Sequence, residues 1–246
     1  MVDAPAASRV IALTHRQAGK TTAAAVGIGH TMLWRQPGST SLTLAPTLRQ
    51  SSELIRNLRG RLLAAGERLT VDNVFAIELA NGSRALALPG ADDASIRGLS
   101  IDGDCVVDEA ARVSDALYEA ARPMLIRHVT TARLILLSTA WARTGFFHKI
   151  WSEGDSRDWL KIEARVDECR HISQADLDRE RRSMPASAFA REYENVFDSL
   201  EARFFDADVI AAAFGAVSSP TPPIPEGDLD PIITCTPAFG ERAFFS

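Results

Sequence analysis

The sequence predicts an α/β fold in which helices cover both faces of a mostly parallel β-sheet. Short runs of apolar, often β-branched residues alternate along the chain with longer segments of helical character. Two of these runs, 9–13 and 134–137, are almost entirely apolar, as expected for strands that are buried on both faces. Between two further strand-like runs stands Asn81-Gly82, which predicts one inserted β-hairpin.

Composition places the chain among globular proteins with one large domain or two small ones. It has 246 residues, of which 46% are hydrophobic and 24% charged. The formal net charge is −5 and the isoelectric point is near 5.6. No global basic field therefore indicates nucleic acid, and any contact with DNA has to come from a local patch or a partner.

The three cysteines and the lack of long apolar runs indicate the cellular compartment in which we expect the protein. Cys105, Cys169 and Cys235 are far apart and fit no metal-binding spacing, which favours reduced thiols. No run approaches the ~18–20 apolar residues of a membrane span, and the first residues lack the apolar region of a signal peptide. We therefore expect a cytoplasmic protein without a membrane partner.

The first apolar run leads into a glycine–lysine loop, and an Ala-rich segment from Thr21 to Trp34 favours a helix after it. Strand, loop and helix together form a nest of backbone N–H groups suited to phosphate oxygens. Lys20 can then reach the β- and γ-phosphates, and the Thr21 hydroxyl can hold Mg²⁺. The candidate nucleotide-binding residues are Arg16, Gln17, Ala18, Gly19, Lys20, Thr21 and Thr22.

This loop departs from the usual phosphate-binding pattern, because Thr14 stands where a glycine is expected. The shorter motif Gly-Lys-Thr also occurs by chance in solvated loops, with the threonine as a helix cap. The motif alone therefore leaves both interpretations open, and residues further along the sequence have to decide between them.

The elements after the first helix follow the same alternation. A turn at 36–39 precedes a strand at 41–45, and apolar residues at helical spacing predict a helix over 47–65. The other face of that helix is rich in arginine, typical of a solvated face and also compatible with phosphate contacts. Strands 75–79 and 84–88 form the predicted hairpin, and a polar loop follows from 91 to 100.

Two acidic residues follow the next buried run, 105–107. Asp108 and Glu109 stand at its carboxyl end, where open α/β sheets bind their ligands. In phosphoryl transfer to water the first acid can hold Mg²⁺ and the second can polarise the attacking water. The alternative is a helix cap followed by an acid in the first turn. We expect a helix over 115–127, interrupted near Pro123.

Polar residues that end the run 134–137 complete the candidate site. Ser138 and Thr139 would lie beside the γ-phosphate, although a capping pair of hydroxyls is an equal alternative. Two arginines are candidates for contact with the phosphates: Arg16 within the loop, and Arg97 acting as a finger across a subunit boundary. The alternative for each is a surface arginine in a local ion pair.

The motifs in this order resemble the ATPase domain of large terminase subunits, the DNA-packaging motors of tailed bacteriophages. The resemblance covers residues 9 to about 200 and includes the loop without its first glycine. It is carried by His15-Arg-Gln-Ala-Gly-Lys-Thr-Thr22, Ala45-Pro-Thr-Leu-Arg-Gln-Ser51, the Asn-Gly hairpin, Ser95-Ile-Arg-Gly98, Val106-Val-Asp-Glu-Ala-Ala111 and Leu137-Ser-Thr139.

The resemblance implies a RecA-like P-loop NTPase of the ASCE type, a three-layer sandwich that hydrolyses ATP with Mg²⁺. Lys20 and Thr21 would bind phosphate and Mg²⁺, Asp108 would be the Walker B acid and Glu109 the catalytic glutamate. Ser138 and Thr139 would couple hydrolysis to movement of DNA, and Arg16 and Arg97 would complete the active site. Implied partners are double-stranded DNA, the portal protein, the small terminase subunit and four further copies in a pentameric ring on the procapsid in the host cytoplasm.

The ends of the chain differ from the family pattern. Only a short segment precedes the loop, so the pocket for the base is expected to be incomplete. We expect an ATPase core over 1–165, a small helical subdomain over 166–215, and a Pro-rich tail over 216–246. Helices are expected at 173–184 and 185–194, the first with a capping box at Ser173. The residues after the Pro-rich stretch are too few for the nuclease domain that terminases carry, so nuclease activity is expected to be absent.

Two other functions fit the same residues. One is a helicase or translocase, because Asp108-Glu-Ala-Ala111 resembles the helicase box, although no room remains for a second motor domain. The other is an inactive partial terminase, such as a prophage remnant. The complete set of predicted catalytic side chains argues against that second alternative, whereas the short ends of the chain argue for it.

Overall fold

The computed structural model describes residues 9–89, 99–153, 158–169 and 172–198, and its central feature is one eight-stranded β-sheet. The strand order is β3-β4-β5-β2-β6-β7-β1-β8. Neighbouring strands are parallel throughout the part β5-β2-β6-β7-β1-β8 of this order, and the pairs β3–β4 and β4–β5 are antiparallel. The strands are β1 Arg9–Thr14, β2 Thr40–Ala45, β3 Leu69–Asp72, β4 Ala76–Leu79, β5 Arg84–Pro89, β6 Asp104–Asp108, β7 Arg133–Ser138 and β8 Trp159–Ala164.

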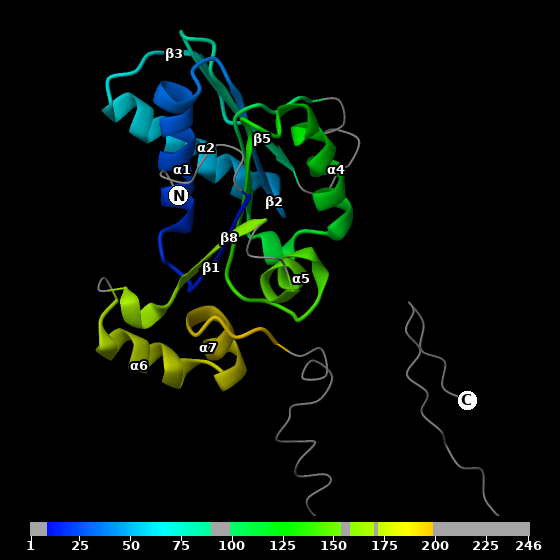
Figure 1. The fold of residues 1–246 in the computed structure, drawn as a ribbon. Coiled ribbons are helices and arrows are strands. Elements are labelled where there is room, and N and C mark those ends of the chain that lie inside the picture. The colour runs from blue at the N-terminus through cyan, green and yellow to red at the C-terminus, as the bar shows by residue number, and fades with distance from the viewer. Residues whose placement is uncertain (1–8, 90–98, 154–157, 170–171, 199–246) are drawn as a thin grey trace, which may run out of the picture. The chain divides into compact units, whose positions relative to one another are not determined.

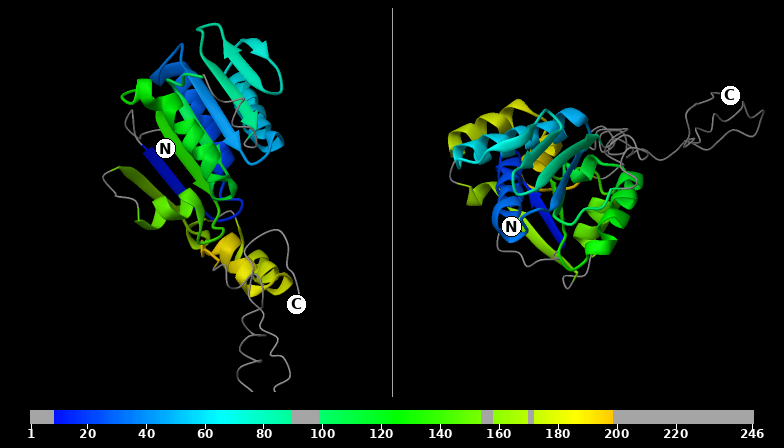
Figure 2. Two further views of the ribbon diagram at one scale, coloured as in Figure 1. Left: turned by 90° about the vertical axis from the view of Figure 1, so that its right-hand side faces the viewer. Right: turned by 90° about the horizontal axis from the view of Figure 1, so that it is seen from above.

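Helices cover both faces of this sheet (Figures 1 and 2), as predicted. Helices α1 and α2 pack on one face, and α4 and α5 pack on the other. Helices α6 and α7 lie together beyond one end of the sheet (Figure 1). Their bounds are α1 Lys20–His30, which continues as a π-helical turn Thr31–Arg35, α2 Leu48–Ala64, α4 Asp115–Leu125, α5 Gly145–Glu153, α6 Gln174–Ser183 and α7 Ala186–Tyr193.

The two apolar layers follow from alternation along the buried strands. In β1, Val10 and Ala12 face the cluster that contains α1 and α2, whereas Ile11 and Leu13 face the cluster that contains α4 and α5. All four side chains are at most 4% exposed. Because successive side chains of a strand point to opposite faces, a strand that is apolar throughout requires cover on both sides.

The predicted hairpin is present, but its two strands have different places in the sheet. β4 and β5 pair antiparallel on either side of a turn in which Gly82 has a φ of 83°. β5 also pairs in parallel with β2, so it joins the hairpin to the parallel part of the sheet. Two strands were not predicted, namely β3 and β8, which form the two edges. Edge strands carry little continuous apolar sequence, and this weakens their signal.

The helical predictions were largely correct. Thr47 caps α2 in a capping box with Gln50, and the Ser173 hydroxyl accepts a bond from the Asp176 amide at the start of α6. The interruption expected at Pro123 is displaced, because α4 continues to Leu125 before it changes into a 3₁₀ turn, Ile126–His128.

Helices α6 and α7 have a small apolar cluster of their own, formed by Leu177, Phe189 and Tyr193. The division of the chain at residues 165 and 215 stays a prediction, and the Pro-rich tail lies outside the described residues. Within the described part of the chain, no helix combines the length and the apolar character that crossing a membrane requires.

Candidate active site

The glycine–lysine loop connects β1 to α1 with two left-handed residues. Gln17 has a φ of 64° and Gly19 a φ of 80°. A Cβ on Gly19 would meet no atom within 4 Å, so its backbone conformation rather than space favours glycine. Gly19 is the N-cap of α1 and offers no side-chain acceptor to the first amides of the helix. Those amides are therefore suited to bind an anion.

The loop meets the end of β6 through two contacts between residues distant in sequence. The Lys20 Nζ lies 2.9 Å from the Glu109 Oε1, and the Thr21 hydroxyl donates to the Asp108 Oδ2 at 2.9 Å. Strand β7 lies between β1 and β6, and all three are parallel. The carboxyl ends of these three strands consequently lie at the same end of the sheet, as the sequence predicted.

Asp108 is a buried carboxylate, only 5% exposed. It accepts one bond from Thr21 and a second, at 2.9 Å, from the amide of Glu109. Burial raises the pKa of Asp108 above its ordinary value, and the nearby Lys20 and the two hydrogen bonds oppose this shift.

The donor atoms fit Mg²⁺. The Thr21 hydroxyl oxygen and the Asp108 carboxylate oxygen, which lie 2.9 Å from each other, are both hard ligands. In nucleotide sites, Mg²⁺ uses one or two such protein ligands together with phosphate oxygens. Among the described residues, no group of three or more His, Cys, Asp or Glu side chains could hold a metal ion. By their chemistry, Thr21 and Asp108 are residues that could hold such an ion.

Glu109 has an unusual backbone and a side chain directed to the loop. Its φ of 52° places it in the left-handed region, which is strained for a residue with a side chain. It precedes a 3₁₀ turn, Ala110–Arg112, but its side chain makes no cap hydrogen bond there. The carboxylate pairs with Lys20 instead.

The remaining predicted residues lie around this centre. Ser138 ends β7, is fully buried and accepts a bond from the Ala111 amide at 3.2 Å. Thr139 is buried beside it. Ala18 lies within the loop, and Thr22 is exposed in the first turn of α1. Arg97 lies outside the described residues.

Three further residues, which the sequence did not single out, join the site. Arg112 lies 4.0 Å from the Glu109 carboxylate, 4.1 Å from the centre of the Trp141 ring and 3.4 Å from the Glu192 carboxylate. Glu192 also pairs with Arg16 at 3.8 Å. Arg112 follows the acidic pair at helical spacing, which is a weak signal, whereas nothing local identifies Glu192.

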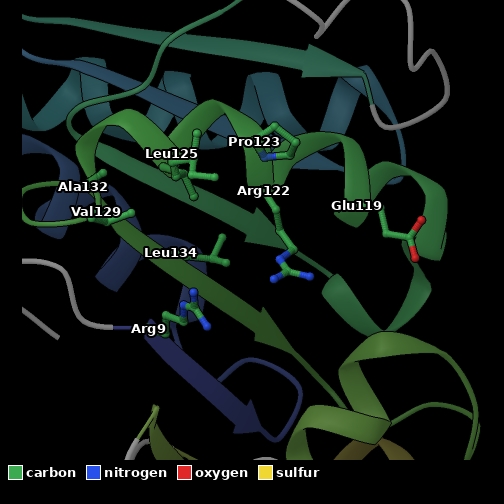
Figure 3. A pocket seen from close by; sticks show the side chains of 9 residues that line it. Arg9, Glu119, Arg122, Pro123, Leu125, Val129, Ala132 and Leu134 are labelled. Atoms are coloured by element: carbon green, nitrogen blue, oxygen red, sulfur yellow. The ribbon is translucent and has the colours of Figure 1, made fainter.

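A separate cavity of about 370 Å³ lies near the amino ends of β1 and β7 (Figure 3). The guanidinium groups of Arg9 and Arg122 point into it, above apolar residues that include Leu125 and Leu134. Because the loop and the acidic pair stand at the carboxyl ends of the strands, this cavity is not part of the candidate site.

Comparison with known proteins gives matches among solved structures. No family model matches the sequence, and no curated protein matches it. The ATPase domain of the large terminase from Thermus phage P74-26 matches with 19% identity and a TM-score of 0.66, over 80% of this chain and 90% of that domain. The large terminase of another thermophilic bacteriophage, in complex with ADP, matches with 16% identity and a TM-score of 0.65.

The large terminase of bacteriophage HK97 matches with 17% identity and a TM-score of 0.59. The match covers 77% of this chain for both the ADP complex and the HK97 protein, and it spans about half of those two proteins, 48% and 47% respectively. At these identities the likeness concerns the fold, and it confirms the predicted fold class. The chain therefore has the RecA-like α/β fold of phage large terminase ATPase domains.

Proposed function

We propose that this chain is the ATP-hydrolysing motor domain of a phage DNA-packaging terminase, and that it couples hydrolysis to translocation of DNA. One observation carries the proposal: the loop of β1 and the acidic pair of β6 are joined by Lys20–Glu109 and Thr21–Asp108 contacts of 2.9 Å. A cation, a hydroxyl and two carboxylates arranged beside a helix N-terminus have the composition of a site for a Mg²⁺–triphosphate.

Each side chain has a defined task in this proposal. The loop amides and Lys20 would hold the β- and γ-phosphates, and Thr21 and Asp108 would hold Mg²⁺, an ion that would supply positive charge to the phosphate oxygens. Since the phosphates compete with Glu109 for Lys20, nucleotide binding frees the Glu109 carboxylate. Glu109 then orients the attacking water and accepts its proton.

The residues that end β7 supply a route from hydrolysis to movement. Ser138 accepts a bond from the Ala111 amide, two residues after Glu109, so a shift of this turn is transmitted to β7. We further propose that Arg97 of one subunit completes the site of the next in a pentameric ring. The ring would act on the portal protein with the small terminase subunit and double-stranded DNA, in the host cytoplasm. These partners rest on the sequence resemblance and the shared fold.

Nucleotide binding and turnover test the proposal separately. Lys20→Ala is expected to abolish ATP binding, whereas Glu109→Gln is expected to keep binding and to lose at least about 100-fold in turnover, as removal of a general base does. Lys149→Ala and Glu153→Gln, both at exposed positions of α5, are the matched controls. In the unsubstituted chain, a hundredfold excess of nucleotide over Kd should add about 2.7 kcal/mol to the unfolding free energy. Unchanged hydrolysis by Glu109→Gln would refute the role of Glu109.

A further inference from the structure

The cavity near the amino ends of β1 and β7 combines an apolar wall with two cations (Figure 3). Its volume of about 370 Å³ lies within the usual range of ligand pockets, about 300–1,000 Å³. The guanidinium groups that point into it come from two elements, Arg9 from β1 and Arg122 from α4. The apolar wall is formed by Pro123, Leu125, Ile126, Val129, Ala132 and Leu134. A ligand that fills this cavity therefore has to match an apolar part and a cationic part.

Neither of the two cations is neutralised by a carboxylate within the described part of the chain. Arg122 lies 5.9 Å from the centre of the Tyr118 ring, and no described Asp or Glu forms an ion pair with Arg122 or Arg9. Glu119 also lines the cavity, but Figure 3 shows its carboxylate directed away from both guanidinium groups. Burial raises the pKa of the Tyr118 hydroxyl, and the charges of Arg122 and Arg9 oppose that rise. The cavity is thus locally positive in a chain whose net charge is −5.

The apolar surface continues outside the cavity. Ile126 and Val129 line the cavity, yet their side chains are 69% and 60% exposed. A ligand no larger than the cavity would leave most of these two side chains in water. A longer peptide segment would cover them, and burial of apolar surface is the main driving force of association. The exposed rim therefore favours a segment of a protein over a small molecule.

The anionic group that fits this cavity is a carboxylate. An arginine fork binds both carboxylates and phosphates, so the two guanidinium groups alone do not distinguish them. A nucleic acid backbone carries one phosphate per nucleotide and is bound by surfaces with many cations. Here two cations stand beside apolar residues, and Glu119 adds a negative charge at the rim. An Asp or Glu next to a large apolar residue satisfies both parts of the cavity.

We propose that this cavity is a docking site for a partner protein, and that it takes a segment in which an Asp or Glu stands beside a large apolar residue. The carboxylate pairs with Arg9 and Arg122, and the apolar side chain packs on Leu125 and Leu134. This inference goes beyond the proposed ATPase function and does not depend on it. The cavity lies near the amino ends of the strands, whereas the phosphate loop stands at their carboxyl ends.

Selection of random heptapeptides on the unsubstituted chain tests which ligand the cavity takes. The enriched peptides should carry Asp or Glu directly beside Leu, Ile, Met or Phe. Replacing that acid by its amide in a synthetic copy of the best peptide should weaken binding by about tenfold or more, because the charge-assisted pairs are lost. Absence of any enriched peptide, or enrichment of peptides without a carboxylate, would overturn the proposal.

Variants of the chain locate the binding of the best peptide, measured by fluorescence anisotropy. Arg9→Gln and Arg122→Gln should each weaken it by about tenfold or more, and Ile126→Ser by about three- to tenfold. All three positions are exposed, so the variants should fold, and thermal unfolding checks this. The matched control is Arg127→Gln, which makes the same charge change in the 3₁₀ turn beside the cavity but at a residue that does not line it. Its effect should stay below about twofold.

Competition separates the proposed ligand from the two other classes. Hexanoate offers a carboxylate on a small apolar body, and a short DNA duplex offers phosphates without one. Neither should displace the peptide at concentrations at which the unlabelled peptide does. Displacement by hexanoate would indicate a small-molecule site and displacement by DNA a phosphate site, and either result would overturn the proposal. An equal loss of affinity in Arg127→Gln and Arg122→Gln would also overturn it, because the peptide would then bind by charge alone.

Discussion

Asp104 is the centre of a buried ionic network, and its removal should destabilise the fold strongly. The carboxylate of Asp104 accepts two bonds from Arg133, at 2.7 and 2.8 Å, and one from Arg35 at 2.8 Å. The Thr31 hydroxyl donates a fourth bond at 2.7 Å. Asp104 and Arg133 are both completely buried, and burial lowers the pKa of Arg35. The network joins the first residues of β6 and β7 to the end of the helix that follows the phosphate loop.

The magnitude follows from the burial of Arg133. Asp104→Ala takes the carboxylate away from a guanidinium that has no access to water, and such a loss costs about 3–5 kcal/mol. For a chain of this length, each kcal/mol lowers Tm by about 2–4 °C, so we expect a decrease of about 6–20 °C. The matched control is Glu53→Ala, which breaks an exposed ion pair with Arg56 worth about 0–1 kcal/mol.

Urea unfolding followed by far-ultraviolet circular dichroism measures both variants. The expected result is a large decrease of the midpoint for Asp104→Ala and almost none for Glu53→Ala, with similar slopes. Asp104→Asn keeps the shape of the side chain and should fall between them. A loss below about 1 kcal/mol for Asp104→Ala would refute the reasoning, because the buried guanidinium would then have found another way to be neutralised.

Further predictions concern titration, thiol chemistry and helix capping. Burial raises the pKa of the Asp108 carboxyl in the folded state, so the folded state binds the carboxyl proton more tightly than the unfolded state does. The stability that this proton contributes is therefore present below pH ~3.8 and is lost as the pH rises. In EDTA, Asp108→Asn should therefore gain stability relative to the unsubstituted chain as the pH rises above ~3.8, and a difference that does not change with pH would contradict this. Burial raises the pKa of the Cys105 thiol to about 12, so in a Cys235→Ser background a thiol reagent at pH 8 should modify Cys169 quickly and Cys105 only at the rate of unfolding. Thr47→Ala should cost about 0.5–2 kcal/mol in thermal unfolding by removing the cap of α2; an unchanged Tm would show that the cap contributes nothing.

Local chemistry explains why many elements were predictable. The buried strands β1, β2, β6 and β7 stand out because helices on both faces demand apolar residues throughout. Caps such as Thr47 and the left-handed Gly82 of the hairpin are set by interactions within a few residues. The edge strands β3 and β8 escaped prediction because their side chains are partly exposed and their pattern is weak.

The loop motif by itself indicated a phosphate-binding site. The acidic pair at the end of a buried strand indicated which carboxylates should lie beside that loop. These signals are local, because backbone shape and residue type are set within one turn of chain. Only the tertiary structure decided which charges meet. The sequence has 27 basic and 32 acidic residues, so Lys20 could pair with many carboxylates other than that of Glu109. The order of strands brings those two together, and the packing of α7 brings Glu192 to Arg16 and Arg112.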